Sequence, residues 1–110
     1  MATSKTDLLP GTLDMLVLKT LTVAPLHGYA IAQQLERLSQ EVVQVEEGSL
    51  YPALERLQAQ GLVTGKWGKS PTGRRARYYT ITASGRRRLG EDVADFDTLV
   101  QAISRILGRA

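Results

Sequence analysis

The 110-residue sequence is long enough for one domain with a small hydrophobic core, because 43% of its residues are hydrophobic. It contains no cysteine, which excludes disulfides, thiolate nucleophiles and thiolate metal sites. The net charge is only +3, but eight of the 14 basic residues lie between Lys66 and Arg88 without an acidic residue among them, and a positive surface of this kind is suited to binding nucleic acid.

The beginning of the sequence shows neither a signal-peptide pattern nor a membrane-spanning segment. Lys5 and Asp7 interrupt the first residues before any apolar run starts. The longest apolar run near the start, residues 15–18, is far too short to cross a membrane. We therefore expect a cytoplasmic protein made of a single domain, residues 1–110.

The first predicted helix follows Gly11 and ends before Pro25, because proline breaks a helix. Thr12 can cap its N-terminus, and Asp14 lies in the first turn, where the helix dipole favours a carboxylate. A helix that is apolar on two sides is expected to be buried on two sides. Helical spacing gives this one a larger face with Leu13, Leu16, Val17 and Leu21, and a smaller face with Met15 and Leu18.

The second predicted helix starts at about His27 and is followed by a short extended segment over residues 41–45. Helical spacing directs Ile31, Leu35 and Leu38 inward. The single histidine precedes a glycine at the helix start. We expect it to cap or pack there rather than to act as a catalytic base.

The third predicted helix runs from Gly48 or Ser49 to Gln60, and Gly61 is its stop signal. This start is chosen because Pro52 is tolerated only in the first turn, where its missing N–H has no partner to lose. The inward face carries Leu50, Leu54 and Leu57. The opposite face carries Ser49, Pro52, Glu55, Arg56 and Ala59, with Tyr51 at its margin.

A basic β-hairpin is predicted next. Leu62–Thr64 opens its first strand, Tyr78–Ile81 forms the second, and Ser70–Gly73 is the turn between them. Aromatic and β-branched residues beside the positive charges favour strands over a disordered basic tail. A basic hairpin that follows a helix-turn-helix unit is the outline of a DNA-binding wing.

The last predicted helix begins after the N-cap Thr82 and continues to about Leu107. Its apolar residues repeat as a heptad seam, which needs another helix to cover it. We expect a homodimer in which this seam and the smaller face of the first helix contact a second copy of the chain. The expected dimerisation residues are Met15, Leu18, Leu89, Val93, Phe96, Val100, Ile103 and Leu107.

The order of these elements predicts a mainly α fold with a small β-hairpin, in the α+β class. A winged helix-turn-helix over about residues 12–82 is followed by a long C-terminal dimerisation helix over about residues 83–107. The third helix would place its N-terminal residues in the major groove of DNA, and the hairpin would touch the backbone or the minor groove.

Four stretches of the sequence resemble the PadR family of bacterial transcription regulators. They are HGYAI from His27, EEGSLYPALERL from Glu46, GLV from Gly61 and RYYTITASG from Arg77. The similarity extends from about Leu13 to Gly85, and Gly48–Leu54 is its most specific motif. The wing departs from many members, because residues 73–76 are Gly-Arg-Arg-Ala in place of Gly-Arg-Pro-Arg.

The resemblance implies a winged-helix homodimer that represses a nearby operon and lacks a separate C-terminal domain. Some members bind an aromatic or drug-like effector near the dimer interface. Phe96 is then the candidate for lining an effector cavity, and the alternative is a plain seam residue that packs on its partner. No cofactor and no metal are expected.

The residues expected to contact double-stranded DNA are Tyr29, Ser49, Tyr51, Pro52, Arg56, Lys69, Arg74, Arg75 and Arg77. On the third helix, only Arg56 can pair bidentately with guanine, whereas Ser49 and Tyr51 can bond phosphate. The alternatives are an ordinary amphipathic surface helix and a solvated charged hairpin. The residues 86–88, all arginine, either contact phosphate or form a solvated helix end.

Together these features predict a sequence-specific DNA-binding transcriptional regulator, namely a homodimeric repressor released by a small-molecule effector. The alternative is a winged-helix module that binds protein rather than DNA. Uninterrupted positive charge favours DNA, because a protein partner seldom requires it. An enzyme is not expected, since the sequence has no phosphate loop and no convincing metal-ligand or paired-carboxylate arrangement.

Overall fold

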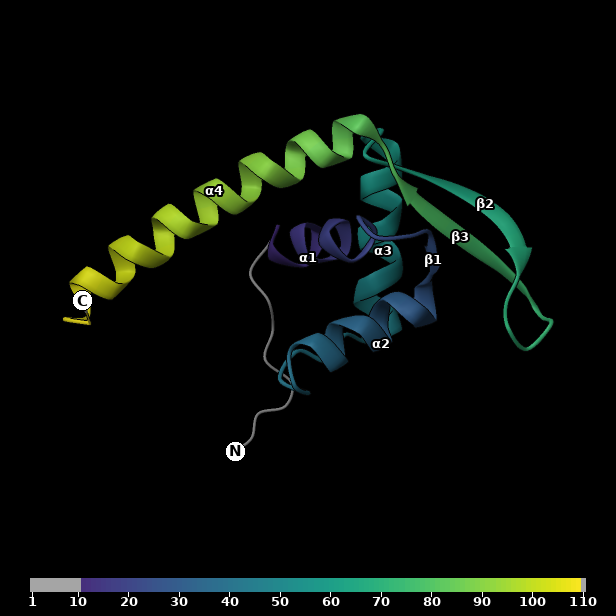
Figure 1. Ribbon diagram of the computed structural model, residues 1–110, viewed down its shortest axis with the longest axis horizontal. Coiled ribbons are helices and arrows are strands. Elements are labelled where there is room, and N and C mark those ends of the chain that lie inside the picture. Colours follow the sequence, from purple (N-terminus) through teal and green to yellow (C-terminus); the bar gives the residue numbers. More distant parts are fainter. Residues whose placement is uncertain (1–10, 110) are drawn as a thin grey trace.

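The structure, a computed structural model, describes residues 11–109 and has the expected mainly α architecture with a small sheet (Figure 1). A helix-turn-helix unit and a β-hairpin form one body, from which a long C-terminal helix extends away. The predicted winged helix-turn-helix fold is confirmed. In chain order the elements are α1 (Thr12–Thr20), β1 (Leu26–His27), α2 (Gly28–Leu38), α3 (Glu47–Ala59), β2 (Val63–Lys69), β3 (Arg75–Ile81) and α4 (Ala83–Ile106).

The sheet is antiparallel, with the strand order β1-β3-β2. The predicted hairpin is present and longer than expected: its register runs from Val63 opposite Ile81 to Lys69 opposite Arg75. The third strand, β1, was not predicted, because two residues are too few to show a period of two. It places His27 opposite Tyr78 and thereby connects the start of α2 to the hairpin.

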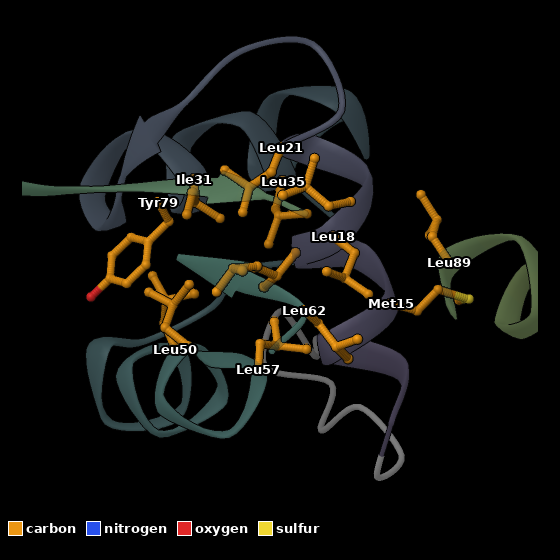
Figure 2. Close-up of a cluster of buried hydrophobic side chains, with 14 residues drawn as sticks. Met15, Leu18, Leu21, Ile31, Leu35, Leu50, Leu57, Leu62, Tyr79 and Leu89 are labelled. Atoms are coloured by element: carbon orange, nitrogen blue, oxygen red, sulfur yellow. The ribbon is translucent and has the colours of Figure 1, made fainter. Parts of the chain in front are cut away.

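The hydrophobic core lies between α1, α2, α3 and the base of the sheet (Figure 2). Leu18, Ile31, Leu54 and Val63 are at most 1% exposed and represent all of these elements. Met15 is 7% exposed and packs in the same cluster, together with Leu89 from the beginning of α4. The core is therefore assembled within one chain.

Two expectations for α1 are wrong. The helix was expected to be broken by Pro25, but it already ends at Thr20, and its N-cap is Gly11 in the left-handed region (φ 88°) rather than Thr12. The hydroxyls of Thr20 and Thr22 donate to the carbonyls of Val17 and Lys19, both at 2.7 Å. Side chains thus satisfy carbonyl groups of the last turn, where threonine competes with continued helix.

The helix α2 starts as predicted, and the Nδ1 atom of His27 accepts a hydrogen bond from the Ala30 N–H at 3.2 Å. Leu38, expected to face inward, is instead 64% exposed at the last turn. The segment 41–45, expected to be extended, starts in a turn, where Gln40 and Glu41 both have positive φ angles, and contains neither strand nor helix. Strand formation requires extended backbone at successive residues.

The helix α3 begins at Glu47, one residue before the earliest predicted start. Pro52 is therefore the sixth helical residue and lies in the second turn, not in the first. It leaves the carbonyl of Gly48 without its usual intrahelical N–H. Gly48 is exposed, so water can satisfy that oxygen, and the helix continues through the proline.

The helix α4 agrees with the prediction at both ends. The Thr82 hydroxyl oxygen accepts a hydrogen bond from the Gly85 N–H at 3.0 Å and donates to the carbonyl of Gly61 at 2.8 Å. A side chain at position 85 would collide with the carbonyl oxygen of Leu62, so glycine permits this close approach. Within residues 11–109, no helix is both long enough and apolar enough to cross a membrane.

Candidate nucleic-acid interface

The hairpin β2–β3 extends beyond the core as a narrow arm (Figure 1), which we call the wing, residues 63–81. Its tip is closed as predicted by the turn Ser70–Gly73. The Ser70 N–H donates to the carbonyl of Arg74 at 2.7 Å, and the Gly73 N–H donates to the carbonyl of Ser70 at 2.8 Å. Gly73 has a φ of 86°, a conformation that glycine adopts without strain.

One face of the wing gathers cations around an indole ring. The strand register places Trp67 opposite Arg77 and Lys69 opposite Arg75, so all four side chains project from the same face. The guanidinium carbon of Arg75 lies 4.5 Å from the centre of the Trp67 ring, and that of Arg77 lies 5.7 Å away. Both distances lie within the range of cation–π attraction.

Arg77 is confined from two further sides. Its guanidinium covers the Cα atom of Gly65, where even a Cβ atom would collide with it. It also interacts with the hydroxyl of Tyr79, the residue opposite Gly65. Burial raises the pKa of Tyr79 above its usual value, and the positive charge of Arg77 opposes that rise. Arg77 is therefore held among three residues of the same wing face.

The other face of the wing is tied to the rest of the fold. The Tyr78 hydroxyl donates a 2.7 Å hydrogen bond to the carbonyl of Lys69, near the wing tip. The Tyr78 ring meets the His27 ring edge to face, with their centres 5.3 Å apart. Because His27 also caps α2, these contacts fix the wing relative to the start of that helix.

A groove of about 960 Å³ separates the wing from the helices. Tyr29 at the start of α2 and Tyr51 on α3 line one side, and Arg74, Arg75 and Arg77 line the other. The ring of Tyr51 lies so close to Gly28 that a side chain there would collide with its hydroxyl. The structure thus brings five of the expected DNA-binding residues together at one groove.

Arg56 lies apart from this groove and faces α1. Its Nη2 atom is 2.9 Å from the Oδ1 atom of Asp14, and its Nε atom donates to Oδ2 at 3.4 Å. This hydrogen bond and the charge of Asp14 raise the pKa of Arg56. Ser49, two helical turns earlier, projects from the same side of α3, and both it and Pro52 are exposed.

The residues 86–88 at the start of α4 each have a partner within the chain. Arg86 donates to the carbonyl of Thr22 at 3.2 Å, Arg87 to the hydroxyl of Ser84 at 3.1 Å, and Arg88 to the carboxylate of Asp92 at 3.3 Å. The contact of Arg86 places positive charge just after the C-terminus of α1, where the helix dipole favours it. All three arginines nevertheless remain exposed.

The expected dimerisation residues fall into two groups. Met15, Leu18 and Leu89 are buried in the core of the single chain, so their assignment to an exposed stripe is wrong. The later seam residues are exposed, as are two apolar neighbours. This group, the distal stripe of α4, consists of Val93, Phe96, Leu99, Val100, Ile103, Ile106 and Leu107.

Phe96 is 44% exposed and borders a hollow of about 240 Å³ between the start of α1 and α4. Leu99 contributes apolar surface to this hollow, and Asp95 and Arg88 contribute charge. Small-molecule sites usually enclose about 300–1,000 Å³. The hollow is smaller than that range.

Sequence reasoning did not assign to the interface three residues that shape it: Asp14, Gly65 and Trp67. The pairing of Asp14 with Arg56 joins positions 42 residues apart and leaves no local signal. Trp67 and Arg77 become neighbours only when the hairpin register is known. The alternation of Gly65, Trp67 and Lys69 along one strand was the available clue, since alternate residues share a face.

Comparison with known proteins is consistent with this geometry. Residues 17–91 match the Transcriptional regulator PadR-like family. The transcriptional regulator Rv3488 of Mycobacterium tuberculosis is 35% identical over 77 residues, which cover 70% of this chain and 68% of that protein. A PadR family transcriptional regulator from Eggerthella lenta has a TM-score of 0.75 and 33% identity over 91% of this chain and 85% of its own. A PadR family transcription regulator from Clostridium difficile has a TM-score of 0.75 and 25% identity, and the match covers 88% of this chain and 99% of that chain.

Proposed function

Because the chain belongs to the PadR-like family of transcriptional regulators, we propose that it binds an operator as a homodimer and represses transcription until a small aromatic effector releases it. Binding to DNA and regulation of transcription follow from the family. The homodimer, the repressor role, the effector and the contact residues are the proposal. The proposed role is regulatory, so measurements of DNA binding and of dimer assembly test it.

The groove between the wing and the helices is the observation that carries the proposal. Tyr29 and Tyr51 supply hydroxyl groups that can bond phosphate, and Arg74, Arg75 and Arg77 supply charge on the facing side. In a winged helix the exposed side of α3 enters the major groove while the wing contacts the neighbouring backbone or minor groove. Lys69 extends the positive surface of the wing toward its tip.

Arg56 and its neighbours complete the proposed contacts on α3. Ser49 and Pro52 are exposed beside the groove-facing Tyr51, where they can approach the DNA backbone. Arg56 can reach a guanine only if its guanidinium leaves Asp14. The ion pair therefore competes with base contact, and the two roles of Arg56 can be separated by removing Asp14.

The distal stripe of α4 supports the homodimer. A row of apolar residues on a helix that leaves the body of the protein is expected to find cover. Charge complementarity favours a second copy in antiparallel orientation. Crossing near Val100 would bring Arg105 of one helix, and Arg109 just after its end, beside the acidic stretch Glu91–Asp97 of the other. Two wings would then face one duplex, as a palindromic operator requires.

The hollow beside Phe96 supports the effector site. Apolar surface from Phe96 and Leu99 can bind an aromatic ring. Three aspartates, Asp14, Asp92 and Asp95, outnumber Arg88 in the hollow and favour a neutral or cationic substituent. Because the hollow in one chain is smaller than usual ligand sites, the remaining walls must come from the partner helix. Effector binding and dimer geometry would then be linked through the same residues.

A salt titration tests DNA binding by the wing. We expect affinity for nonspecific duplex to fall roughly a thousandfold between low and moderately high salt if the dimer neutralises on the order of six phosphates. Arg74→Ala combined with Arg75→Ala should flatten the slope of log affinity against log salt concentration. Arg37→Ala is the matched control, because this exposed arginine is in the last turn of α2, at the end opposite Tyr29.

Two results would contradict the proposal. A slope that is the same in the double variant and in the Arg37→Ala variant would show that the wing does not touch phosphate. Absence of any duplex binding by the unaltered protein at low salt would favour the alternative of a module that binds protein.

A further inference from the structure

We propose that Trp67 is a positioning residue for DNA binding: its indole ring holds the guanidinium groups of Arg75 and Arg77 in place before the wing meets the duplex. The proposal rests on the proposed DNA-binding function and assigns a role to a residue outside the expected contact set. It predicts that Trp67 acts through the two arginines rather than by touching DNA itself.

The register of the hairpin carries the argument. Trp67 is directly opposite Arg77, and Arg75 is diagonal to it on the same strand as Arg77. Its ring therefore contacts one guanidinium toward the wing tip, at 4.5 Å, and one toward the core, at 5.7 Å. The three side chains form a row, cation–indole–cation, which we call the Trp67 row.

The exposure of Trp67 indicates that its ring does not serve the core. The side chain is 53% exposed, although tryptophan is usually largely buried. Trp67 instead lines the groove that Tyr29 and Tyr51 border. The indole contacts the guanidinium groups of Arg75 and Arg77, so holding these two cations is a role that its position allows.

The other neighbours of Arg77 restrict where it can go. Gly65 leaves space for the guanidinium directly above the strand, and Tyr79 contacts it from the core side. Within residues 11–109, neither Arg75 nor Arg77 forms an ion pair with a carboxylate, so their charge stays available for phosphate. The Trp67 row thus fixes the position of the two cations without neutralising them.

Fixing these positions has an energetic consequence. An arginine side chain that is mobile in the free protein loses rotamer freedom when it binds phosphate, and this loss lowers affinity. Cation–π contacts at exposed sites are strong enough to restrict such a side chain. For two arginines, removal of the ring should weaken DNA binding on the order of tenfold.

A double-mutant cycle tests the proposal on the full chain with nonspecific duplex. We expect Trp67→Leu to weaken binding about tenfold while the salt slope stays unchanged, because the number of phosphate contacts is unchanged. In the Arg75→Ala, Arg77→Ala background, Trp67→Leu should cause no further loss. Trp67→Phe is the matched control: it retains an aromatic face and should lose only a few-fold in affinity.

Folding of the wing is checked separately. Trp67 is the only tryptophan, so its fluorescence in the free protein reports on the row without DNA. Arg75→Ala and Arg77→Ala should each change that emission. The thermal midpoints of Trp67→Leu and Trp67→Phe show whether either variant unfolds. If Trp67→Leu is unfolded, the same cycle is measured with Trp67→Phe.

The outcomes separate this proposal from the proposed function. If Trp67→Leu weakens the double-arginine variant by the same factor as the unaltered protein, Trp67 contacts DNA itself and the positioning role is rejected. Unchanged affinity of Trp67→Leu also rejects it, while DNA binding stands. Absence of duplex binding by the unaltered protein rejects the proposed function and the positioning role together.

Discussion

The helices α1 and α4 both carry apolar residues on more than one side, but the fold covers these residues to different extents. On α1, Met15 and Leu18 are 7% and 0% exposed, because α2, α3 and the start of α4 surround this short helix. On α4, Leu89 is the only large apolar residue that is buried, and the exposure of Val93 and Val100 is 39% and 43%. The radius of gyration, 15.1 Å against about 13 Å for a compact chain of this length, agrees with elements that project from the body.

One chain therefore combines a body that buries its own apolar residues with a helix, α4, whose distal stripe is uncovered. Hydrophobic periodicity indicates that a helix face will be buried, but it does not say by which element. The apolar residues of α1 are buried by other elements of the same chain. The distal stripe of α4 remains for a partner, and we expect changes in the two regions to have different consequences.

The largest effect is expected for Val100→Asp in the distal stripe. A carboxylate at the centre of the seam would be buried without a partner in both protomers, at about 3–5 kcal/mol for each uncompensated charge. We expect the dimer to split and specific operator binding to disappear. Sedimentation velocity and operator binding of the purified variant are the measurements.

Thr98→Asp is the matched control, because position 98 projects from the side of α4 opposite the seam. It adds the same charge and should leave both assembly and affinity intact. A Val100→Asp protein that remains a dimer and binds its operator normally would mean that the distal stripe does not form the interface.

A smaller effect is expected for Leu18→Ala in the body. Truncation of a fully buried leucine should lower the free energy of unfolding by about 2–5 kcal/mol through lost burial and a residual cavity. Urea denaturation should show this loss at every protein concentration. Ile103→Ala is the comparison: it should act through the dimer, so its effect should grow or shrink with protein concentration.

If the stability of both variants depended on protein concentration in the same way, the distinction between the body and the distal stripe of α4 would be contradicted. If Leu18→Ala behaved like Ile103→Ala, α1 would belong to the interface after all. The original expectation for Met15 and Leu18 would then be restored in the dimer, despite their burial in the single chain.

The smallest effect is expected at the junction of α1 and α3, where Arg56 pairs with Asp14. If Arg56 contacts a base, Arg56→Ala should lower discrimination between operator and random DNA by on the order of tenfold to a hundredfold. Asp14→Asn should then improve discrimination by releasing the guanidinium. Competition binding with operator and random duplex measures both.

The two variants also identify the alternative. If Arg56 only joins α1 to α3, Arg56→Ala and Asp14→Asn should produce the same slight change in thermal midpoint, as expected for an exposed ion pair. Neither would then alter discrimination. A uniform loss of affinity for both DNA sequences in Arg56→Ala would place Arg56 on the backbone.

Local sequence patterns were sufficient to predict the order of the helices, the turn of the wing, the cap at Thr82 and the extent of α4. Each of these depends on neighbours within a few residues, where spacing and capping act directly. The motif Gly48–Leu54 likewise indicated the family. The segregation of positive charge was visible for the same reason, because the residues concerned are close in sequence.

Which apolar faces are covered, and which cations are free of an ion pair, depends on the packing of distant segments. β1 forms because β3 is beside it, and Pro52 is tolerated in the second turn because Gly48 faces water. Arg56 finds Asp14 across 42 residues, and Trp67 meets Arg75 and Arg77 through the hairpin register. These contacts depend on how distant segments pack together, and local spacing does not encode the partner that packing supplies.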